Sequence, residues 1–121
     1  MTQQYPKVWS WAGERKPKPL EFYTAAPEAI GFYELGFIVN GSFKAQYGGR
    51  AMGITLRERL KTHYHNSHNK NVQKHRSELY FRCKVLASEE LVAYVEAVSI
   101  AALEYPWNRR NEWTQHWALE T

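Results

Sequence analysis

Two runs of strand-forming residues, joined by Asn40-Gly41, constrain the fold of this chain more than any other feature. Residues 30–39 are rich in aromatic and β-branched residues, and residues 42–47 follow as the returning strand. Asn-Gly is the preferred pair for a two-residue type I′ turn. We therefore expect a β-hairpin that brings Tyr33 and Tyr47 to the same end of the two strands, since each lies about six to seven residues from the turn.

The remaining elements follow from capping residues and periodicity. Thr55 can cap a helix over residues 56–64, and Ser88 can cap a second helix that runs to about Tyr105 and stops at Pro106. Between them, residues 79–86 alternate apolar and polar side chains as a strand does. The polar residues 66–77 have no clear period and allow at most a short helix. The expected order is strand, strand, helix, strand, helix, which is an α+β arrangement.

The bulk properties indicate one domain. With 121 residues, of which 44% are hydrophobic, the chain has room for a single core. We expect residues 1–29, where aromatic residues alternate with Lys, Arg and Pro, to form an arm that packs on a domain of residues 30–121 with a C-terminal tail. This arm could instead be a stacking surface for nucleic acid. The chain has no apolar run of about 20 residues, no apolar signal stretch and one cysteine, Cys83, so we expect a cytoplasmic protein.

Positive charge is concentrated in the middle of the chain. The net charge is +4, but the segment from Arg50 to Lys84 contains nine Lys and Arg residues and only two acidic residues, Glu58 and Glu78. Such a segment suits a polyanion, although a solvated basic face is the alternative. The residues that we expect to contact nucleic acid are Arg50, Arg57, Lys61, His65, Lys70, Lys74 and Arg76.

The acidic residues limit the possible chemistry. The chain contains no Asp, so a scheme built on paired aspartates is excluded and a single carboxylate fits better. Glu96 lies four residues from both Val92 and Ile100, in or beside an apolar stripe, and needs a cation, a metal ion or hydrogen bonds there. An ion pair with Arg59 or with another basic residue is the structural alternative. Arg59 and His63 are four residues apart on their helix and can reach one site together.

These residues together resemble the GIY-YIG endonuclease superfamily, over roughly residues 30–110. Two spacings make the likeness specific: His63 follows Arg59 after four residues, and Asn108 follows Glu96 after twelve. The resemblance implies a small three-stranded antiparallel sheet flanked by helices. The matching segments are Gly31-Phe32-Tyr33, Tyr47-Gly48-Gly49, the Leu-Arg-Glu-Arg-Leu of residues 56–60, His63, Glu96 and Tyr105-Pro106-Trp107-Asn108.

The resemblance also implies roles for the motif residues. Tyr33 and Tyr47 would lie near the attacking water, and one of them would be the general base. We favour Tyr33, with Tyr47 assisting; His63 also contributes and could itself be the base. Arg59 would bind the scissile phosphate, with Arg57 as its competitor. Glu96 would hold a single Mg²⁺, for which Mn²⁺ could substitute, and Asn108 would support the site.

The implied function is a Mg²⁺-dependent, single-metal DNA endonuclease, a hydrolase of phosphodiester bonds. One alternative is a catalytically inactive nucleic-acid-binding module of the same fold, and another is a structural or protein-interaction domain. We expect DNA rather than RNA as the partner, no membrane, and a monomer or homodimer, with a second protein as a further source of specificity. A zinc site is a weaker alternative, built from His63, His65, His68 and His75.

Overall fold

The computed structural model describes residues 16–108, and the figures draw the rest in grey. Residues 1–15 of the expected arm and the tail after Asn108 lie outside this range. The elements in chain order are β1 (Lys18–Pro19), the 3-10 helix η1 (Leu20–Ala25), β2 (Gly31–Val39), β3 (Ser42–Ala51), α1 (Leu56–Asn66), α2 (Lys70–His75), the 3-10 helix η2 (Arg76–Glu78), β4 (Tyr80–Val85) and α3 (Glu89–Leu103).

The predicted hairpin is confirmed as β2 and β3. Its turn has positive φ at both positions, 52° at Asn40 and 79° at Gly41. The register shifts by one residue between Leu35 and Gly36, so that Leu35 pairs with Tyr47 but Gly36 pairs with Ala45. Because cross-strand partners share a face of the sheet, this β-bulge places Tyr47 on the same face as Leu35 and Tyr33.

Within residues 16–108 the sheet has four strands, in the order β1-β4-β2-β3, and every neighbouring pair is antiparallel. The expectation of three strands missed β1, in which Lys18 and Pro19 pair with Phe81 and Tyr80. Two residues are too few to show an alternating pattern. Proline is tolerated there because an edge strand need not donate on its outer side.

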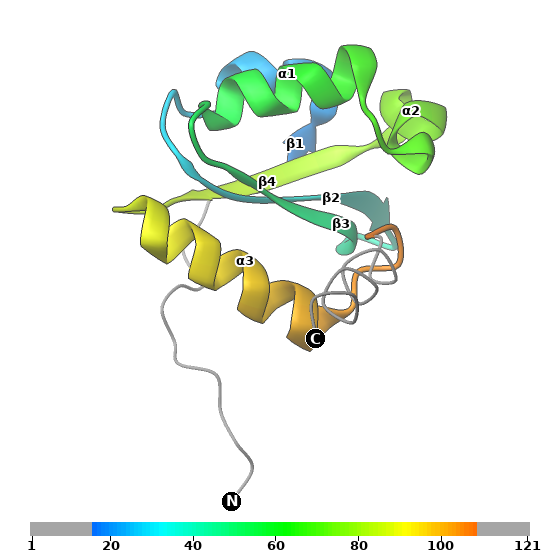
Figure 1. The fold of residues 1–121 in the computed structure, drawn as a ribbon. Coiled ribbons are helices and arrows are strands. Elements are labelled where there is room, and N and C mark those ends of the chain that lie inside the picture. The colour runs from blue at the N-terminus through cyan, green and yellow to red at the C-terminus, as the bar shows by residue number, and fades with distance from the viewer. Residues whose placement is uncertain (1–15, 109–121) are drawn as a thin grey trace, which may run out of the picture.

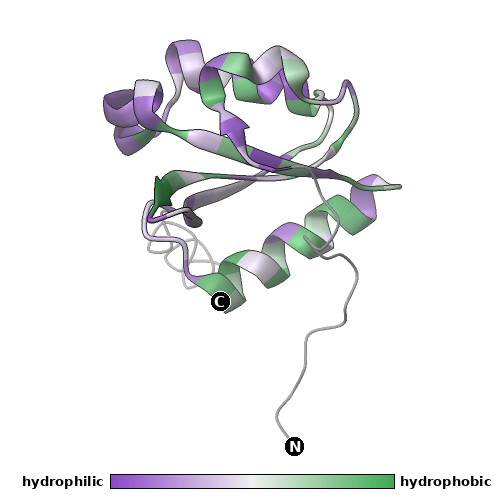
Figure 2. Cartoon of the chain, turned by 180° about the vertical axis from the view of Figure 1, so that it is seen from behind, coloured by the Kyte–Doolittle hydropathy of each residue, from purple (hydrophilic) through white to green (hydrophobic). Residues whose placement is uncertain are grey.

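Helices cover both faces of the sheet (Figure 1). α1 and η1 lie on one face and α3 lies on the other. Green and purple segments alternate along α1 in Figure 2, as expected of a helix with one face on a sheet. Among the described helices, none is long and apolar enough to cross a membrane.

The core has two parts, one on each side of the sheet. Leu20, Tyr33, Leu35, Leu56, Leu60 and Phe81 belong to the α1 side, and Phe32, Leu86, Val92, Val95 and Tyr105 belong to the α3 side. Leu20 is fully buried, so residues of the expected arm contribute to the domain core.

The helix ends position the segments that follow them. The expected caps are confirmed: Thr55 Oγ1 accepts from the backbone of α1, and Ser88 Oγ accepts from the backbone of α3. α3 ends earlier than expected, because Glu104 adopts a left-handed conformation with φ 48°. The chain then turns back along β3, where the Trp107 backbone N–H donates to Gln46 O at 2.8 Å.

Candidate active site

Three aromatic rings from β2, β3 and α1 form the centre of the candidate site. The ring centroid of His63 lies 5.5 Å from that of Tyr33 and 5.3 Å from that of Tyr47, and the two tyrosine rings are 6.4 Å apart. Tyr33 and His63 are each 1% exposed. The structure thus brings together three of the residues expected from the sequence.

Both ring nitrogens of His63 have a hydrogen-bond partner. Nε2 lies 2.6 Å from Tyr33 Oη, and Nδ1 lies 2.8 Å from Ser67 Oγ. In the tautomer that carries its hydrogen on Nδ1, Tyr33 donates to Nε2 while Nδ1 donates to Ser67. Ser67 Oγ also accepts from the Asn69 backbone N–H at 3.1 Å. Sequence reasoning missed Ser67, although it follows His63 by four residues and so lies on the same side of the helix end.

Burial controls the protonation of these rings. It lowers the pKa of His63 from 6.5 to about 3, helped by the neighbouring His68 and Arg59, so the imidazole is neutral at pH 7. Burial also raises the pKa of Tyr33 well above 10, and the Tyr47 charge adds to this effect while Arg59 opposes it. The pKa of Tyr47 is raised mainly by burial as well. At neutral pH the structure therefore holds two protonated phenols beside a neutral imidazole.

Arg59 and Glu96 supply the charges of the site. Arg59 Nε is buried and has no hydrogen-bond partner within residues 16–108. Glu96 lies on α3, which packs against the edge strand β3, and its side chain is 24% exposed. Burial raises the pKa of Glu96, whereas Arg50 and Arg59 lower it. Glu96 forms an ion pair with Arg50, at 3.4 Å, which is one of the other basic residues that the structural alternative allowed besides Arg59.

Asn108 binds the outer edge of β3 through its side chain. Its Oδ1 accepts from the Gly48 N–H and its Nδ2 donates to Gly48 O, both at 2.9 Å. The amide therefore satisfies both backbone groups of Gly48, as a neighbouring strand would. This contact fixes the residue next to Tyr47.

Comparison with solved structures identifies the fold. No protein-family model matches the sequence, and no curated protein matches it significantly. The magnesium-bound GIY-YIG N-terminal endonuclease domain of UvrC from Thermotoga maritima matches with a TM-score of 0.58 and 25% identity, over 73% of this chain and 92% of that one. The chain is a member of the GIY-YIG superfamily. A tyrosine-to-phenylalanine mutant of the same UvrC domain, bound to its divalent cation, has a TM-score of 0.57, 25% identity and the same 73% coverage of this chain, over 91% of that one.

Gly48 and Gly49, in the segment Tyr47-Gly48-Gly49 that matches the second GIY-YIG motif, leave space for two tyrosine rings. A Cβ added at Gly49 would lie 2.6 Å from Tyr33 Cζ, and one added at Gly48 would lie 2.7 Å from Tyr105 Cζ. A real Cβ atom does not approach carbon so closely. Gly48 and Gly49 are therefore required by the packing on the two faces of the sheet.

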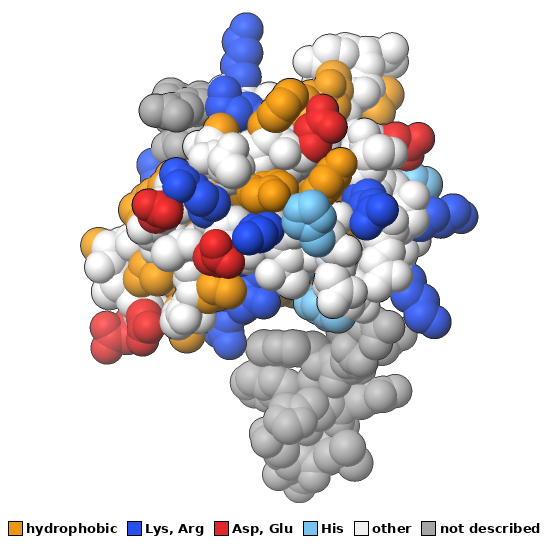
Figure 3. Space-filling view, turned by 90° about the horizontal axis from the view of Figure 1, so that it is seen from above, with side chains coloured by type: hydrophobic (Ala, Val, Ile, Leu, Met, Phe, Trp, Pro, Cys, Tyr) orange, Lys and Arg blue, Asp and Glu red, His pale blue; other side chains and the backbone are white. Residues whose placement is uncertain are grey.

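The basic residues of the GIY-YIG domain fall into two groups. Lys and Arg side chains are scattered over the face that α1 covers (Figure 3). Arg57 is engaged elsewhere, since it pairs with Glu28 at 3.0 Å and its Nε donates to Ala26 O at 2.9 Å; Arg50 pairs with Glu96. The exposed group on α1, α2 and η2 consists of Lys61, His65, Lys70, Lys74 and Arg76.

Two of these exposed residues also contact aromatic rings. His65 Nε2 lies 3.0 Å from Tyr23 Oη, and the Arg76 guanidinium lies 5.8 Å from the Tyr64 ring centroid. His63 and His68 are neighbours, with ring centroids 5.8 Å apart. Within the described part of the chain, however, no three His, Cys or Glu side chains are grouped to hold a metal ion. The four histidines therefore form no zinc cluster there.

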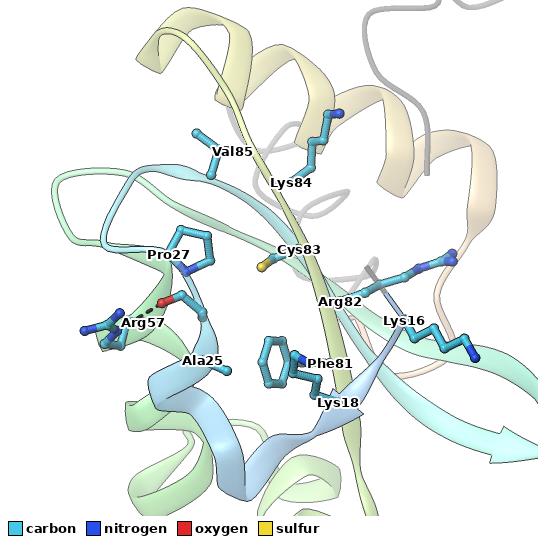
Figure 4. A pocket seen from close by; sticks show the side chains of 11 residues that line it. Lys16, Lys18, Ala25, Pro27, Arg57, Phe81, Arg82, Cys83, Lys84 and Val85 are labelled. Atoms are coloured by element: carbon cyan, nitrogen blue, oxygen red, sulfur yellow. Dashed lines mark hydrogen bonds between the residues drawn. The ribbon is translucent and has the colours of Figure 1, made fainter. Parts of the chain in front are cut away.

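A pocket of about 460 Å³ lies away from the tyrosine–histidine centre (Figure 4). It is formed by β1, η1, the start of α1 and β4, and of the predicted site residues only Arg57 lines it. Phe81 and Cys83 lie along it, whereas the side chains of Arg82 and Lys84 extend away from Arg57 and Pro27. This pocket is therefore separate from the buried Tyr33–His63 pair of the candidate active site.

Proposed function

We propose that this protein is a DNA endonuclease that hydrolyses phosphodiester bonds with one bound Mg²⁺. The observation that carries the proposal is the 2.6 Å hydrogen bond between the buried Tyr33 hydroxyl and a neutral His63, together with an Arg59 Nε that has no hydrogen-bond partner among the described residues. The UvrC domain that shares this fold is an endonuclease domain bound to a catalytic divalent cation, which supports the same chemistry here.

Tyr33 and His63 act as one base. As water attacks phosphorus, Tyr33 Oη takes a proton from the water while its own proton moves to His63 Nε2, which becomes an imidazolium. The phenol stays neutral throughout, so its raised pKa does not prevent the reaction. A bound phosphodiester adds negative charge nearby and so raises the pKa of His63 toward the range of a proton acceptor. Tyr47, packed against both rings, orients the pair.

Arg59 binds the scissile phosphate. Its buried Nε has no hydrogen-bond acceptor in the described part of the chain, which is unfavourable for a charged group, and a nonbridging phosphate oxygen supplies one. Arg57 is the weaker candidate because Glu28 and a backbone carbonyl already occupy its guanidinium. The positive charge of Arg59 then stabilises the charge that develops on the phosphate oxygens.

Glu96 is the residue that would hold the metal ion. Mg²⁺ is commonly bound through one or two carboxylates and keeps several waters, so one partly exposed carboxylate with an unfavourably buried charge fits it. When bound, Mg²⁺ supplies positive charge that stabilises the leaving 3′ oxygen. Mn²⁺, which accepts the same oxygen ligands, would substitute for it.

The substrate and setting follow from the chemistry. The exposed basic residues of α1, α2 and η2 would contact the DNA backbone through charge, without reading sequence. One active site cuts one strand, so a double-strand cut needs a homodimer, two visits by a monomer or a partner protein. We expect the protein to act in the cytoplasm of a bacterial or phage-infected cell, where its DNA substrate would be found.

Nicking of supercoiled plasmid tests the proposal. Wild-type protein with Mg²⁺ should produce open circles, and Glu96→Ala should abolish nicking while leaving the gel shift of DNA unchanged. Glu90→Ala, an exposed carboxylate on the same helix, is the matched control and should nick normally. Wild-type protein that shifts DNA but leaves it intact with both Mg²⁺ and Mn²⁺ would instead be a binding module. If the protein neither cleaves nor binds DNA, the alternative of a structural or protein-interaction domain is favoured.

A further inference from the structure

A buried carboxylate that the proposed chemistry does not use lies on the opposite face of β2 from Tyr33. Glu34 is 1% exposed. One carboxylate oxygen accepts from Arg82 Nε at 2.7 Å, and the other accepts from the Tyr105 hydroxyl. Burial of a carboxylate is unfavourable without such partners, so the three side chains form one unit.

This unit contacts β3, the edge strand that carries Tyr47, through Tyr105. Glu34 is the cross-strand partner of Gly48, and the Tyr105 ring fills the space where a side chain of Gly48 would lie. Tyr105 is 2% exposed, and its ring also packs on Phe32, with centroids 6.5 Å apart. Gly48 is therefore held in two ways: by the amide of Asn108 at its peptide groups, and by the Tyr105 ring on its α3 side.

Gly48 occupies a sensitive place in the site. It links Tyr47 to Gly49, and Gly49 lies against the Tyr33 ring. Two consecutive glycines weaken a strand because they lose more conformational freedom and offer no side chain to pack. Tyr105 replaces the missing side chain at Gly48, and Glu34 fixes the hydroxyl end of the Tyr105 ring.

We propose that Glu34 and Tyr105 are positioning residues for the nuclease reaction, which rests on the function proposed above. They hold Gly48 against Asn108, and so keep Tyr47 and Gly49 in register with the Tyr33–His63 pair. They act from the face of the sheet opposite the reacting groups and touch neither water nor phosphate. Gly48 and Tyr105 therefore share one space in the packing, so a larger residue at position 48 requires a smaller one at position 105.

Steady-state nicking kinetics test this role. Tyr105→Phe keeps the ring but loses the bond to Glu34, and Glu34→Gln keeps the shape but loses the charge. Each should lower kcat by about tenfold with KM changed by less than about twofold, since only the geometry of the reacting groups is affected. Tyr94→Phe and Glu90→Gln are the controls, because both residues are exposed on α3, and they should leave both constants unchanged.

A compensating pair separates positioning from general stability. Gly48→Val should lose activity beside Tyr105, Tyr105→Ala should lose activity through a loosened strand, and the double variant should recover at least about a third of the wild-type kcat. Folded Tyr105→Phe and Glu34→Gln variants with wild-type kcat would overturn the proposal, and so would a double variant no better than the worse single one.

Amide hydrogen exchange of Gly48 gives a readout that does not need cleavage. The Gly48 N–H donates to Asn108, so Tyr105→Phe and Glu34→Gln should speed its exchange while the amides of α1 keep their protection. If wild-type protein does not cut DNA but the variants still speed this exchange, the proposed function fails and the structural coupling stands. If the exchange is unchanged, the positioning role fails.

Discussion

The protonation state of His63 makes a quantitative prediction about acid stability. Its pKa is about 3 in the folded protein and 6.5 when exposed, so between these values the unfolded chain binds a proton that the folded protein does not. Protonation then favours unfolding, and stability falls as the pH falls through this window. In the unfolded chain at pH 5, the protonated form of the imidazole exceeds the neutral form about 30-fold. This group alone therefore lowers the free energy of unfolding by about 2 kcal/mol relative to pH 7.

Urea denaturation of wild-type protein and of His63→Gln at both pH values measures this contribution. The glutamine is neutral throughout, so wild-type protein should lose about 2 kcal/mol more than the variant between pH 7 and pH 5. Glu96 works in the opposite direction, because its raised pKa favours the folded state as the pH falls, but it is present in both proteins and cancels. Equal losses in the two proteins would refute the conclusion that the fold keeps His63 neutral, and with it the proton transfer from Tyr33.

Three further outcomes are expected. Gly49→Ala forces a Cβ against the Tyr33 ring and should reduce stability by about 1–3 kcal/mol and nicking by at least about tenfold; a folded variant of wild-type activity would contradict this packing. Arg50→Ala removes the cation that pairs with Glu96, so a Mg²⁺ titration of the nicking rate should reach half-maximum at a lower concentration, and an unchanged midpoint would show that the two cations do not compete. Leu20→Ala should lower the unfolding free energy by about 2–5 kcal/mol in urea, whereas a loss below about 1 kcal/mol would place residue 20 outside the core.

Local signals in the sequence predict much of this fold. Asn40-Gly41 fixes the turn, and Thr55 and Ser88 fix the starts of the two long helices, because each of these residues acts through its own backbone or side chain. The pairing of β1 with β4 was not predictable, since two residues carry no periodicity and their partners are distant in the chain.

The sequence predicts which side chains lie near one another at the candidate site better than it predicts their contacts. Tyr33, Tyr47 and His63 are brought together as the motif spacing indicates. The partner of Glu96 was not predictable, because Arg50 reaches it only through the packing of α3 on β3. The bonds of Glu34 were also missed, since a single Glu within an apolar strand gives no indication of which side chains will surround it.

The β-bulge between Leu35 and Gly36 limits how the hairpin can change in length. Without the extra residue in β3, Tyr47 would pair with Glu34 and face α3, away from Tyr33. Between the bulge and the turn, a residue added to each strand leaves the pairing of Leu35 with Tyr47 intact, and exposed Ile38 and Val39 show that this tip carries little of the core. A single residue added to one strand there would move one tyrosine to the wrong face. Relatives of this chain should therefore differ in hairpin length by even numbers of residues.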